Sequence, residues 1–587
     1  MREELRRSSE GGFSFPAGVH GALCVVRDSV RMGKERRRLV CVCCGLVVAV
    51  VAVLLIIVCV SRSKCPGERF SHAAVAADSL RCSNIGRDIL LEGGSAVDAA
   101  ISALLCTALV NPQSMGLGGG AIFTIMDSSG KVKVISSRET VPKNFRQDLL
   151  QHCPKTVKLT TGPQWIGVPG ELRGYARAHA LYGKLPWARL FEPIIKLARD
   201  GFPMPEYLAQ FLQHKFIKPM VQNSSLCELF CHKNKTVLGV GDTLRYPKLA
   251  DTLEIIAKQG AEAFYTGQVA QDLIRDVQEA GGQLSLEDLE SFEVRVDEAR
   301  TVLLGEYKMH IPPLPAGGAM ISLILNIMHG FGLSPASLQG NQTALTLHRY
   351  IEAAKFANGQ RMKIKDPHYS PQNVDNMMDS SFADEVRAMI RDHSTHPASF
   401  YNITPSTDRF GTTHISVLAA DGSAVSVTST INHIFGSFVL SRRTGIILNN
   451  ELEDFCGRAN SISAGEQPPS SMAPTILQSK DRKKILVIGG SGGSMITTAI
   501  AQSVMNHLWL GKSLKGAISE KVVFVDAQNS VNFEPGFQQS LIEEMRTRGH
   551  IIKGREFFLN VVNAVEKEHG CISAFSDYRK KGMAAGY

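Results

Sequence analysis

After its first 38 residues the chain has no long run of Lys or Arg. The formal net charge is +9, and +4 of it comes from residues 1–38, where nine Lys and Arg stand against five Asp and Glu. The rest of the 587-residue chain is therefore only mildly basic. This distribution argues against a nucleic-acid-binding protein.

The glycine-rich segments lack the residues of nucleotide sites. Met115–Gly120 is not closed by the Gly-Lys-Ser/Thr of a phosphate loop, and Gly490-x-Gly492 leads to Met495 where a dinucleotide fingerprint requires Gly. Cys227 and Cys231 have the spacing of half a metal site, but no second Cys or His pair follows suitably, so a short disulfide loop is favoured. We expect neither a metal nor an organic cofactor.

Charge is also missing from Leu39 to Val60, a run of 22 residues. About 20 apolar residues span a bilayer, whereas the apolar part of a cleaved signal peptide has about 7–15. More positive charge precedes the run than follows it, so the N-terminal side is expected in the cytoplasm. We predict a cytoplasmic tail (1–38), a transmembrane signal anchor (39–60) and a single-pass type II cell-membrane protein. Either Met1 or Met32 could start the chain.

Glycosylation sequons support this topology, because all of them follow the apolar run and none lies after residue 404. We expect N-linked glycans at Asn223, Asn234, Asn341 and Asn402. Several cysteines would likewise face an oxidising compartment, in which disulfides persist. They are Cys82, Cys106, Cys153, Cys227, Cys231, Cys456 and Cys571.

Helices and strands are predicted in both halves of the chain. Ala96–Val110 is a continuous apolar run with Ser95 as a candidate cap, and Ala121–Met126 has the composition of a strand. Polar, irregular residues 364–408 are typical of an exposed linker. Together these segments favour a layered α/β fold. Further helices are predicted at Glu171–Tyr182, Trp187–Asp200, Tyr246–Gln259, Gln268–Ala280 and Met495–Leu510.

A hairpin is predicted directly after the linker. Thr412–Ala419 and Ala424–Ile431 have strand composition and flank Asp421-Gly422, a strong turn signal. A two-residue loop would pair Thr412 with Ile431. A shift of one position would pair it with Thr430 or Asn432 instead, so a polar side chain is expected beside Thr412 in each case.

Thr412 lies in Gly411-Thr412-Thr413-His414, where the linker meets the first strand. If the chain were cut before Thr412, its hydroxyl would lie beside a free α-amino group, a general base suited to neutral pH. Gly411 would permit the backbone conformation that attack on the preceding carbonyl needs. The alternative is that these residues simply open a strand.

Other candidate site residues are scattered along the chain. Glu451, Glu453 and Asp454 could hold an ammonium group, or form an ordinary acidic turn. Gly489–Ser494, between a strand and a helix, could direct N–H groups at an oxyanion. Side chains that could bind a carboxylate are Arg138, Ser470 and Ser471. The alternatives are an ordinary exposed arginine and a plain loop at the two serines.

These pieces occur within an ordered series of motifs that resembles the γ-glutamyltransferase family of N-terminal-nucleophile hydrolases. The resemblance covers about residue 70 to 587. Its motifs are Ala74–Asp78, Gly93–Ala100, Ser137–Thr140, Val168–Tyr175, Pro315–Gly318, Gly411–His414, Thr428–Asn432, Asn450-Glu451 with Asp454, Pro469–Met472, Gly492-Gly493 and Ala584–Tyr587.

The resemblance implies an αββα sandwich cut into a large subunit (61–411) and a small subunit (412–587). Thr412 would be the nucleophile, Thr430 its hydroxyl partner, and Gly492 and Gly493 the oxyanion donors. The implied ligands of the substrate α-carboxylate are Arg138, Ser470 and Ser471, and those of the α-amino group are Asn432, Glu451 and Asp454. It also implies disulfides Cys82–Cys106 and Cys227–Cys231.

Four segments resemble the leukotriene-C4-hydrolysing branch of the family: Val110–Gly120, Gln164–Gly170, Gly445–Leu452 and Phe557–Val562. The implied substrates are glutathione, its S-conjugates and leukotriene C4, with water, amino acids or dipeptides as acceptors. His433-Ile434 and Cys456–Gln467 depart from the family pattern at the expected pocket rim, so substrate preference is open. The alternatives are a general glutathione transpeptidase and an uncleaved cell-surface binding protein.

Overall fold

The computed structural model describes residues 47–51, 65, 67–154, 159, 161–371, 373–403, 411–458, 461–554 and 561–587. Most of the predicted anchor, 39–60, lies outside these residues, and its described part, 47–51, is helical. In the part of the chain that the structure describes, no helix is long and apolar enough to cross a membrane. Gly67–Tyr587 forms one compact unit, described below.

A seven-stranded sheet lies at the centre of this unit, and every strand in it is antiparallel to its neighbours. It combines strands from before and after Thr412. In spatial order they are β18 (Ala585–Gly586), β1 (Ala74–Ala76), β9 (Thr413–Leu418), β10 (Ala424–Thr430), β2 (Gly120–Met126), β3 (Val132–Ser136) and β6 (Arg295–Glu298).

A six-stranded antiparallel sheet faces the first one. It too mixes the two halves of the chain, so a cut before Thr412 would leave both sheets built from two fragments. Its order is β17 (Cys571–Ser576), β16 (Val561–Glu568), β12 (Ile485–Ser491), β11 (Thr475–Ser479), β8 (Tyr307–Ile311) and β7 (Arg300–Leu304). Two small sheets join β13 (Val523–Val525), β14 (Val531–Phe533) and β15 (Ile552–Lys553), and β4 (Phe202–Pro203) with β5 (Thr243–Leu244).

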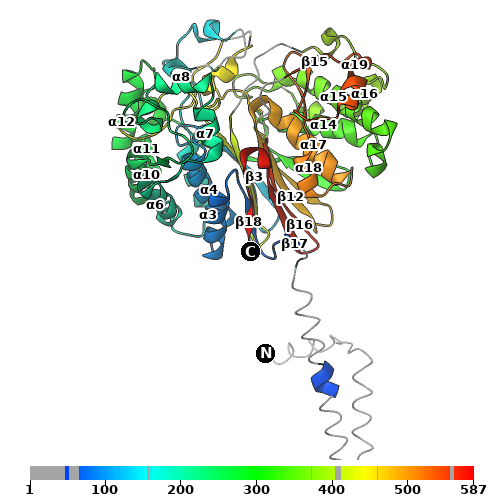
Figure 1. The fold of residues 1–587 in the computed structure, drawn as a ribbon, viewed down its shortest axis with the longest axis horizontal. Helices are drawn as coiled ribbons and strands as arrows, with labels where there is room; N and C mark the ends of the chain where they lie inside the picture. Colours follow the sequence, from blue (N-terminus) through cyan, green and yellow to red (C-terminus); the bar gives the residue numbers. More distant parts are fainter. Residues whose placement is uncertain are drawn as a thin grey trace, which may run out of the picture. The chain divides into compact units, whose positions relative to one another are not determined.

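Helices cover the outer face of each sheet, which gives four layers: helices, sheet, sheet, helices (Figure 1). On the seven-stranded sheet, α4 (Ala96–Val110) packs on β9 and β10, and α5 (Glu171–Tyr182) on β2. On the other sheet, α17 (Ile496–Leu508) packs on β12 and β16. The predicted layered α/β architecture is confirmed.

The remaining helices complete these outer layers. The N-terminal half of the unit contributes α3 (Leu80–Leu91), α6 (Glu192–Asp200), α7 (Glu206–Leu212), α8 (Ile217–Gln222), α9 (Cys227–Phe230), α10 (Pro247–Gln259), α11 (Glu262–Tyr265), α12 (Gln268–Glu279) and α13 (Leu286–Glu290). The others are α14 (Gly318–His329), α15 (Asn341–Gly359), α16 (Ser380–Met389), α18 (Leu514–Ser519) and α19 (Gln539–Thr547).

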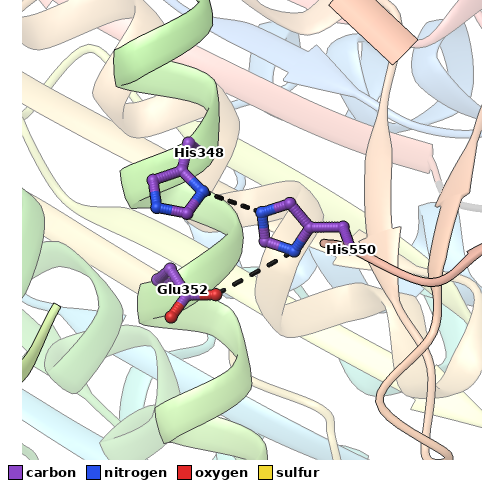
Figure 2. A group of neighbouring side chains, drawn as sticks. All are labelled: His348, Glu352 and His550. Carbon is purple, nitrogen blue, oxygen red and sulfur yellow. Dashed lines mark hydrogen bonds and ion pairs between the residues drawn. The ribbon is translucent and has the colours of Figure 1, made fainter. Parts of the chain in front are cut away.

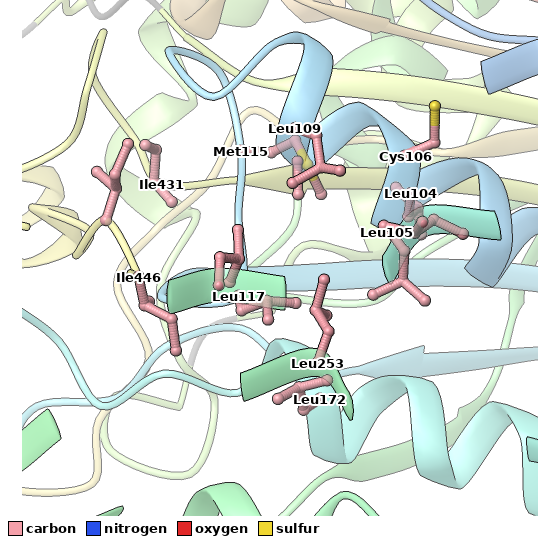
Figure 3. Close-up of a cluster of buried hydrophobic side chains, with 14 of the residues drawn as sticks. Leu104, Leu105, Cys106, Leu109, Met115, Leu117, Leu172, Leu253, Ile431 and Ile446 are labelled. Atoms are coloured by element: carbon pink, nitrogen blue, oxygen red, sulfur yellow. The ribbon is translucent and has the colours of Figure 1, made fainter. Parts of the chain in front are cut away.

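The largest apolar core lies between the seven-stranded sheet and its helices. In Figure 3, leucines of α4 lie among side chains from α5 and α10 and from the segment after Thr412, represented by Ile431 and Ile446. A smaller core between the sheets is lined partly by alanines, among them Ala74, Ala76 and Ala424. Small side chains there let the two sheets approach closely.

The hairpin register differs by one residue from that of a two-residue loop. Ser429 pairs with Thr413 and Ala424 with Leu418, and Ala419 N–H donates to Ser423 O at 2.9 Å. The loop therefore has three residues and ends at Gly422, whose φ of +85° is the left-handed conformation that this loop type requires. This register places Thr430, one of the two polar neighbours expected for Thr412, beside it.

Most predicted helices are confirmed, and two expectations are wrong. Trp187–Asp200 is not one helix, because a short 3-10 turn at Trp187–Leu190 ends before α6 begins with Pro193 at its second position. The segment 364–408 is not simply an exposed linker. It contains α16, whose Ala383 and Val386 are buried.

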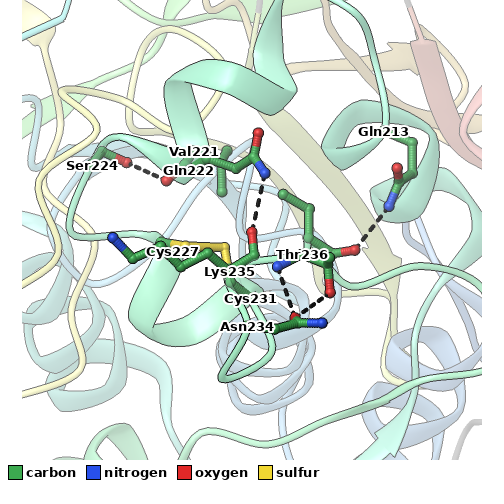
Figure 4. Close-up of a disulfide and its surroundings, with 10 residues drawn as sticks. Gln213, Val221, Gln222, Ser224, Cys227, Cys231, Asn234, Lys235 and Thr236 are labelled. Atoms are coloured by element: carbon green, nitrogen blue, oxygen red, sulfur yellow. Dashed lines mark hydrogen bonds between the residues drawn. A yellow bond between two sulfur atoms is a disulfide. The ribbon is translucent and has the colours of Figure 1, made fainter.

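Disulfides Cys82–Cys106 and Cys227–Cys231 are both present. The second closes a short loop that contains α9, with a sequence separation of 4. It lies beside the Asn234 turn, in which the Asn side chain accepts from Thr236 (Figure 4). A third disulfide, Cys153–Cys456, joins segments 303 residues apart. All four sequon asparagines are exposed: Asn223, Asn234, Asn341 and Asn402.

Candidate active site

Thr412 directly precedes β9 and is almost completely buried, with 4% of its surface exposed. Its Oγ1 lies 3.0 Å from Oγ1 of Thr430, the last residue of β10. The backbone N–H of Asn432 donates to that same Thr430 oxygen at 2.8 Å, which fixes its position. The pair therefore brings a second hydroxyl to the predicted nucleophile.

The backbone at Thr412 is strained. Its φ is +82°, a left-handed conformation that is costly for a β-branched side chain. The preceding Gly411 cannot be replaced without movement, because a Cβ there would lie 1.8 Å from Asn432 O. These two constrained residues flank the peptide bond that would be cut.

The carbonyl of that bond already has a hydrogen-bond donor. The N–H of Gly492 donates to Gly411 O at 3.0 Å. Gly492 and Gly493 follow β12 with φ of +114° and +60°, left-handed values that glycine adopts without a steric penalty. The loop thus presents a backbone donor where negative charge would develop if the carbonyl were attacked.

A buried lysine contacts the backbone of the predicted nucleophile, and it lies in no motif of the sequence. Lys580 Nζ donates to Thr412 O at 2.6 Å and to Ser491 Oγ at 2.8 Å. It also pairs with Asp78 Oδ2 at 2.8 Å, and that carboxylate accepts from Thr413 Oγ1 at 2.5 Å. The start of β9 is therefore fixed by residues near both ends of the chain.

The burial of His414 favours the neutral form of its ring near neutral pH. Its ring is fully buried, with Thr428 Oγ1 and Ser416 Oγ within 3.0 Å of its two nitrogens. Burial, with a smaller contribution from the charge of Lys580, lowers the pKa of His414 to about 3. A Cβ at Gly489 would lie 2.2 Å from this ring, so glycine makes room for it.

Arg138 occupies the centre of a second cluster and is 1% exposed. It pairs with Glu451, and its Nη2 lies 2.5 Å from Asp454 Oδ2. A third carboxylate, Glu139, lies 3.7 Å away. Burial opposes the charge on Arg138, but the three carboxylates together raise its pKa above the ordinary value.

The pKa values of Glu451 and Glu139 are also raised, which for a carboxyl group disfavours the charged form. Burial raises the pKa of Glu451 well above its usual range, although Arg138 acts against this. Burial likewise raises the pKa of Glu139 to about 8. Three acidic groups around one guanidinium leave an excess of potential negative charge, which a ligand ammonium would balance.

The predicted residues Ser470, Ser471 and Asn432 lie near the Arg138 cluster through Asp454 and Asn450. Ser470 and Ser471 line one cavity with Asp454 and Arg361, and Arg361 Nη1 donates to Ser471 Oγ at 2.9 Å. Arg361 was not predicted, because it lies in none of the motifs. Asn432, with φ of +71°, donates through Nδ2 to Asn450 O at 3.1 Å, next to Glu451.

Within the described residues, one group of His and Glu side chains has its ligand atoms within 4.8 Å of one another: His348, Glu352 and His550 (Figure 2). His348 Nδ1 and His550 Nε2 lie 2.8 Å apart. The ammonium of Lys355 lies 2.8 Å from His550 Nδ1 and 3.4 Å from Glu352 Oε1. Lys355 thus already provides the positive charge of this cluster, which we interpret as a buried hydrogen-bonded network.

A sequence model described as Gamma-glutamyltranspeptidase matches residues 82–587. The chain belongs to this family. It is 47% identical over 558 residues to Glutathione hydrolase 5 proenzyme of Rattus norvegicus, covering 92% of this chain and 97% of the relative. The protein of the same name in Homo sapiens is 45% identical over 564 residues, covering 91% and 96%. Glutathione hydrolase 2 of Arabidopsis thaliana is 36% identical, covering 88% and 94%.

Solved structures agree with the fold. Cephalosporin acylase from Bacillus halodurans superimposes with a TM-score of 0.79 at 24% identity, covering 89% of this chain and 97% of that one. At that identity the match shows the fold alone. The Helicobacter pylori gamma-glutamyltranspeptidase has a TM-score of 0.52 at 26% identity, covering 57% and 95%. Membership of the gamma-glutamyltranspeptidase family thus rests on sequence, and the layered α/β fold accords with it.

Proposed function

We propose that this family member is a self-processing γ-glutamyl hydrolase and transferase that uses Thr412 as its nucleophile. One observation carries the proposal: the Thr412 hydroxyl lies beside Thr430, while Gly492 N–H donates to the carbonyl directly before Thr412. A hydroxyl next to a hydrogen-bonded carbonyl, on a residue with a strained backbone, is suited to intramolecular attack.

In the maturation step, Thr412 Oγ1 attacks the carbonyl carbon of Gly411, and the C–N bond to Thr412 breaks as its nitrogen takes a proton. Water then hydrolyses the resulting ester. The products are a large fragment that ends at Gly411 and a small fragment (412–587) that begins with a free α-amino group. Both fragments remain interleaved, because strands of each are neighbours in both sheets.

In turnover, the Thr412 amino group accepts the hydroxyl proton while the oxygen attacks the γ-carbonyl of the substrate. Gly492 and Gly493 stabilise the oxyanion with their N–H groups. The amine of the leaving group takes up the proton and departs, which leaves a γ-glutamyl ester on Thr412. Attack by water or by the amino group of an amino acid or dipeptide then releases the γ-glutamyl group.

The cluster around Arg138 would hold the free α-amino and α-carboxyl groups of the γ-glutamyl unit. Glu451, Asp454 and Asn432 would receive the ammonium, since the site carries an excess of carboxylates. Arg138, Ser470 and Ser471 would bind the carboxylate, because a guanidinium and two hydroxyls supply suitable donors. The buried charges make the site specific for a zwitterionic head group.

Glutathione is the proposed substrate, in keeping with the names of the relatives above. We extend the proposal to glutathione S-conjugates and leukotriene C4, on the resemblance of the four segments named in the sequence analysis. The purified protein should release glutamate and cysteinylglycine from glutathione, and Thr412→Ala should not. Glutamate release by Thr412→Ala at the wild-type rate would overturn the proposal.

The second candidate function is that of a general transpeptidase, which would prefer glutathione as the donor and a dipeptide as the acceptor. Competition between glutathione and leukotriene C4, with and without a dipeptide acceptor, distinguishes the two. A preference for the conjugate and weak acceleration by the acceptor support the leukotriene branch. If glutathione is preferred and the acceptor strongly accelerates turnover, general transpeptidation is correct.

Location at the cell surface is part of the same proposal. Residues 39–60 would anchor a type II protein, with glycans on the four exposed sequon asparagines outside the cell. An uncleaved binding protein on the same scaffold is the remaining alternative. A reducing gel of the purified protein shows either two fragments or one intact chain, and the intact chain would favour the binding protein.

A further inference from the structure

The Cys153–Cys456 disulfide connects the two sides of the proposed cleavage site. Its Cα atoms are 5.6 Å apart, whereas the two cysteines are 303 residues apart in sequence. Cys153 precedes Thr412 and Cys456 follows it. The other two disulfides described above, Cys82–Cys106 and Cys227–Cys231, lie entirely before Thr412. Cleavage would therefore leave the large and small fragments covalently linked through Cys153 and Cys456.

Cys456 ends the short 3-10 segment Glu451–Phe455, which carries two of the carboxylates that contact Arg138. The N–H of Cys456 donates to Glu453 O at 2.9 Å, so the cysteine is held to the turn it follows. Only one residue separates Cys456 from Asp454 in sequence. A bond at this sulfur thus restrains the part of the chain that places Asp454.

The same segment packs in an apolar cluster of its own, separate from the main cores. From the small fragment, Leu452 and Phe455 contribute side chains that are each 1% exposed. From the large fragment come Val141, Leu149 and Trp165, with Cys153 packed at the edge. This cluster buries fewer side chains than the main cores and so contributes less apolar stabilisation than they do, because that stabilisation scales with the buried area.

The ion pairs also cross between the fragments. Arg138 belongs to the large fragment, whereas Glu451 and Asp454 belong to the small one. Separation of a buried pair leaves uncompensated charges, so the geometry of this cluster depends on the docking of one chain on the other. Within the small fragment, Glu453 Oε2 of this segment lies 3.0 Å from His433 Nε2.

We propose that the Cys153–Cys456 disulfide is a positioning bond between the two mature fragments, which holds the Glu451–Phe455 segment against Arg138 and so sets the affinity for the γ-glutamyl head group. A tether makes the docking of this segment intramolecular and keeps its effective concentration high. Cys456 lines the same cavity as Asp454, Ser470 and Ser471, so its release would also loosen the cavity wall. The inference rests on the proposed function.

The first experiment maps the disulfides of the mature wild-type protein. The full chain is alkylated without reduction, digested and analysed by mass spectrometry. The expected result is a linked pair of peptides that contain Cys153 and Cys456, together with a small fragment that begins at Thr412. If both cysteines are found alkylated as free thiols, the inference is overturned.

The second experiment separates positioning from chemistry. The double variant Cys153→Ser/Cys456→Ser should raise KM for the γ-glutamyl donor about 10-fold, because a displaced ligand set weakens binding. Its kcat should stay within about two-fold of wild type, since Thr412, Thr430 and Gly492 lie outside the tethered segment. The matched control Cys227→Ser/Cys231→Ser removes a disulfide within the large fragment and should change neither constant.

A KM for the double variant equal to that of wild type and of the control overturns the inference. If the double variant does not fold, graded reduction of wild type by a soluble dithiol replaces it. KM should then rise in proportion to alkylation of Cys456, and a KM that stays constant while Cys456 is released overturns the inference. Failure of the proposed function differs from both results, because wild type itself would then show no small fragment and no γ-glutamyl hydrolysis.

Discussion

The Oγ1 atoms of Thr412 and Thr430 lie 3.0 Å apart across neighbouring strands, at the end of a hairpin whose three-residue loop sets their register. Asn432 N–H donates to the Thr430 oxygen, so this hydroxyl has a fixed place beside the nucleophile. The chemistry assigned to Thr412 therefore depends on a loop about ten residues away in sequence.

Thr430→Ala should slow both self-cleavage and turnover, with kcat lower by about 100-fold, a magnitude typical for loss of a positioned proton-handling group. Thr430→Ser keeps the hydroxyl and should restore most of both rates. Cleavage is followed on reducing gels and kcat with a γ-glutamyl substrate. If the Ala and Ser variants behave alike, the Thr430 hydroxyl has no role.

Asp454→Asn should fold and cleave itself, because the carboxylate lies outside the Thr412 pair, but it should bind substrate poorly. Loss of one partner from a buried charge contact costs about 2–5 kcal/mol, so kcat/KM should fall by at least about 30-fold. Asp481→Asn, at an exposed turn between β11 and β12, is the control and should behave as wild type. Unchanged kinetics in Asp454→Asn would remove this residue from the site.

The pH dependence of stability should change in Glu171→Gln. Burial raises the pKa of the Glu171 carboxyl to about 8, although Tyr175 and Ser429 donate to it at 2.5 and 2.8 Å. From about pH 4.5 to 8 the folded state then holds a proton that the unfolded state has released, so this group destabilises the fold increasingly as pH rises. Thermal unfolding at pH 5, 6.5 and 8 measures the effect.

Across that range, the melting temperature of Glu171→Gln relative to wild type should increase steadily, because the amide stays neutral. Exposed Glu293→Gln is the control and should keep a constant difference from wild type. Parallel curves for Glu171→Gln and wild type would mean that Glu171 is ionised in the folded protein throughout.

Glycosidase treatment should shorten the large fragment and leave the small fragment unchanged on a reducing gel. All four sequons precede Thr412, and each asparagine is exposed. Substitution of all four asparagines by Gln should abolish the shift. A shift in the small fragment would contradict the proposed division of the chain at Thr412.

Local patterns predicted the local structure well. The bounds of α4 match the predicted helix, because Ser95 and Asp98 form a capping box at its start. Segment 364–408 was misjudged because the apolar face of α16 is short and surrounded by polar residues. The sequence left the hairpin register open by one residue, because Asp421-Gly422 does not fix the length of the loop, and the structure has the register that places Thr430 beside Thr412.

The candidate site shows the same difference between residues in local motifs and residues that make long-range contacts. Residues within recognisable motifs were predicted as site residues, and the structure brings Thr412 to Thr430, Gly492 to Gly411, and Arg138 to Glu451. Lys580 and Cys153 were not assigned a place, since each contacts a partner more than 150 residues away in sequence. Such contacts depend on the assembled sheets and leave no periodic signal in the sequence.

The identity of the first residue of the small fragment tests the central claim most directly. Purified wild-type protein is separated on a reducing gel, and the smaller band is subjected to N-terminal sequencing, with Thr412→Ala as the matched variant. The account predicts that the band begins Thr-Thr-His-Ile and that Thr412→Ala remains one inactive, full-length chain. An active wild-type protein that stays uncleaved, or a small fragment with any other first residue, would contradict it.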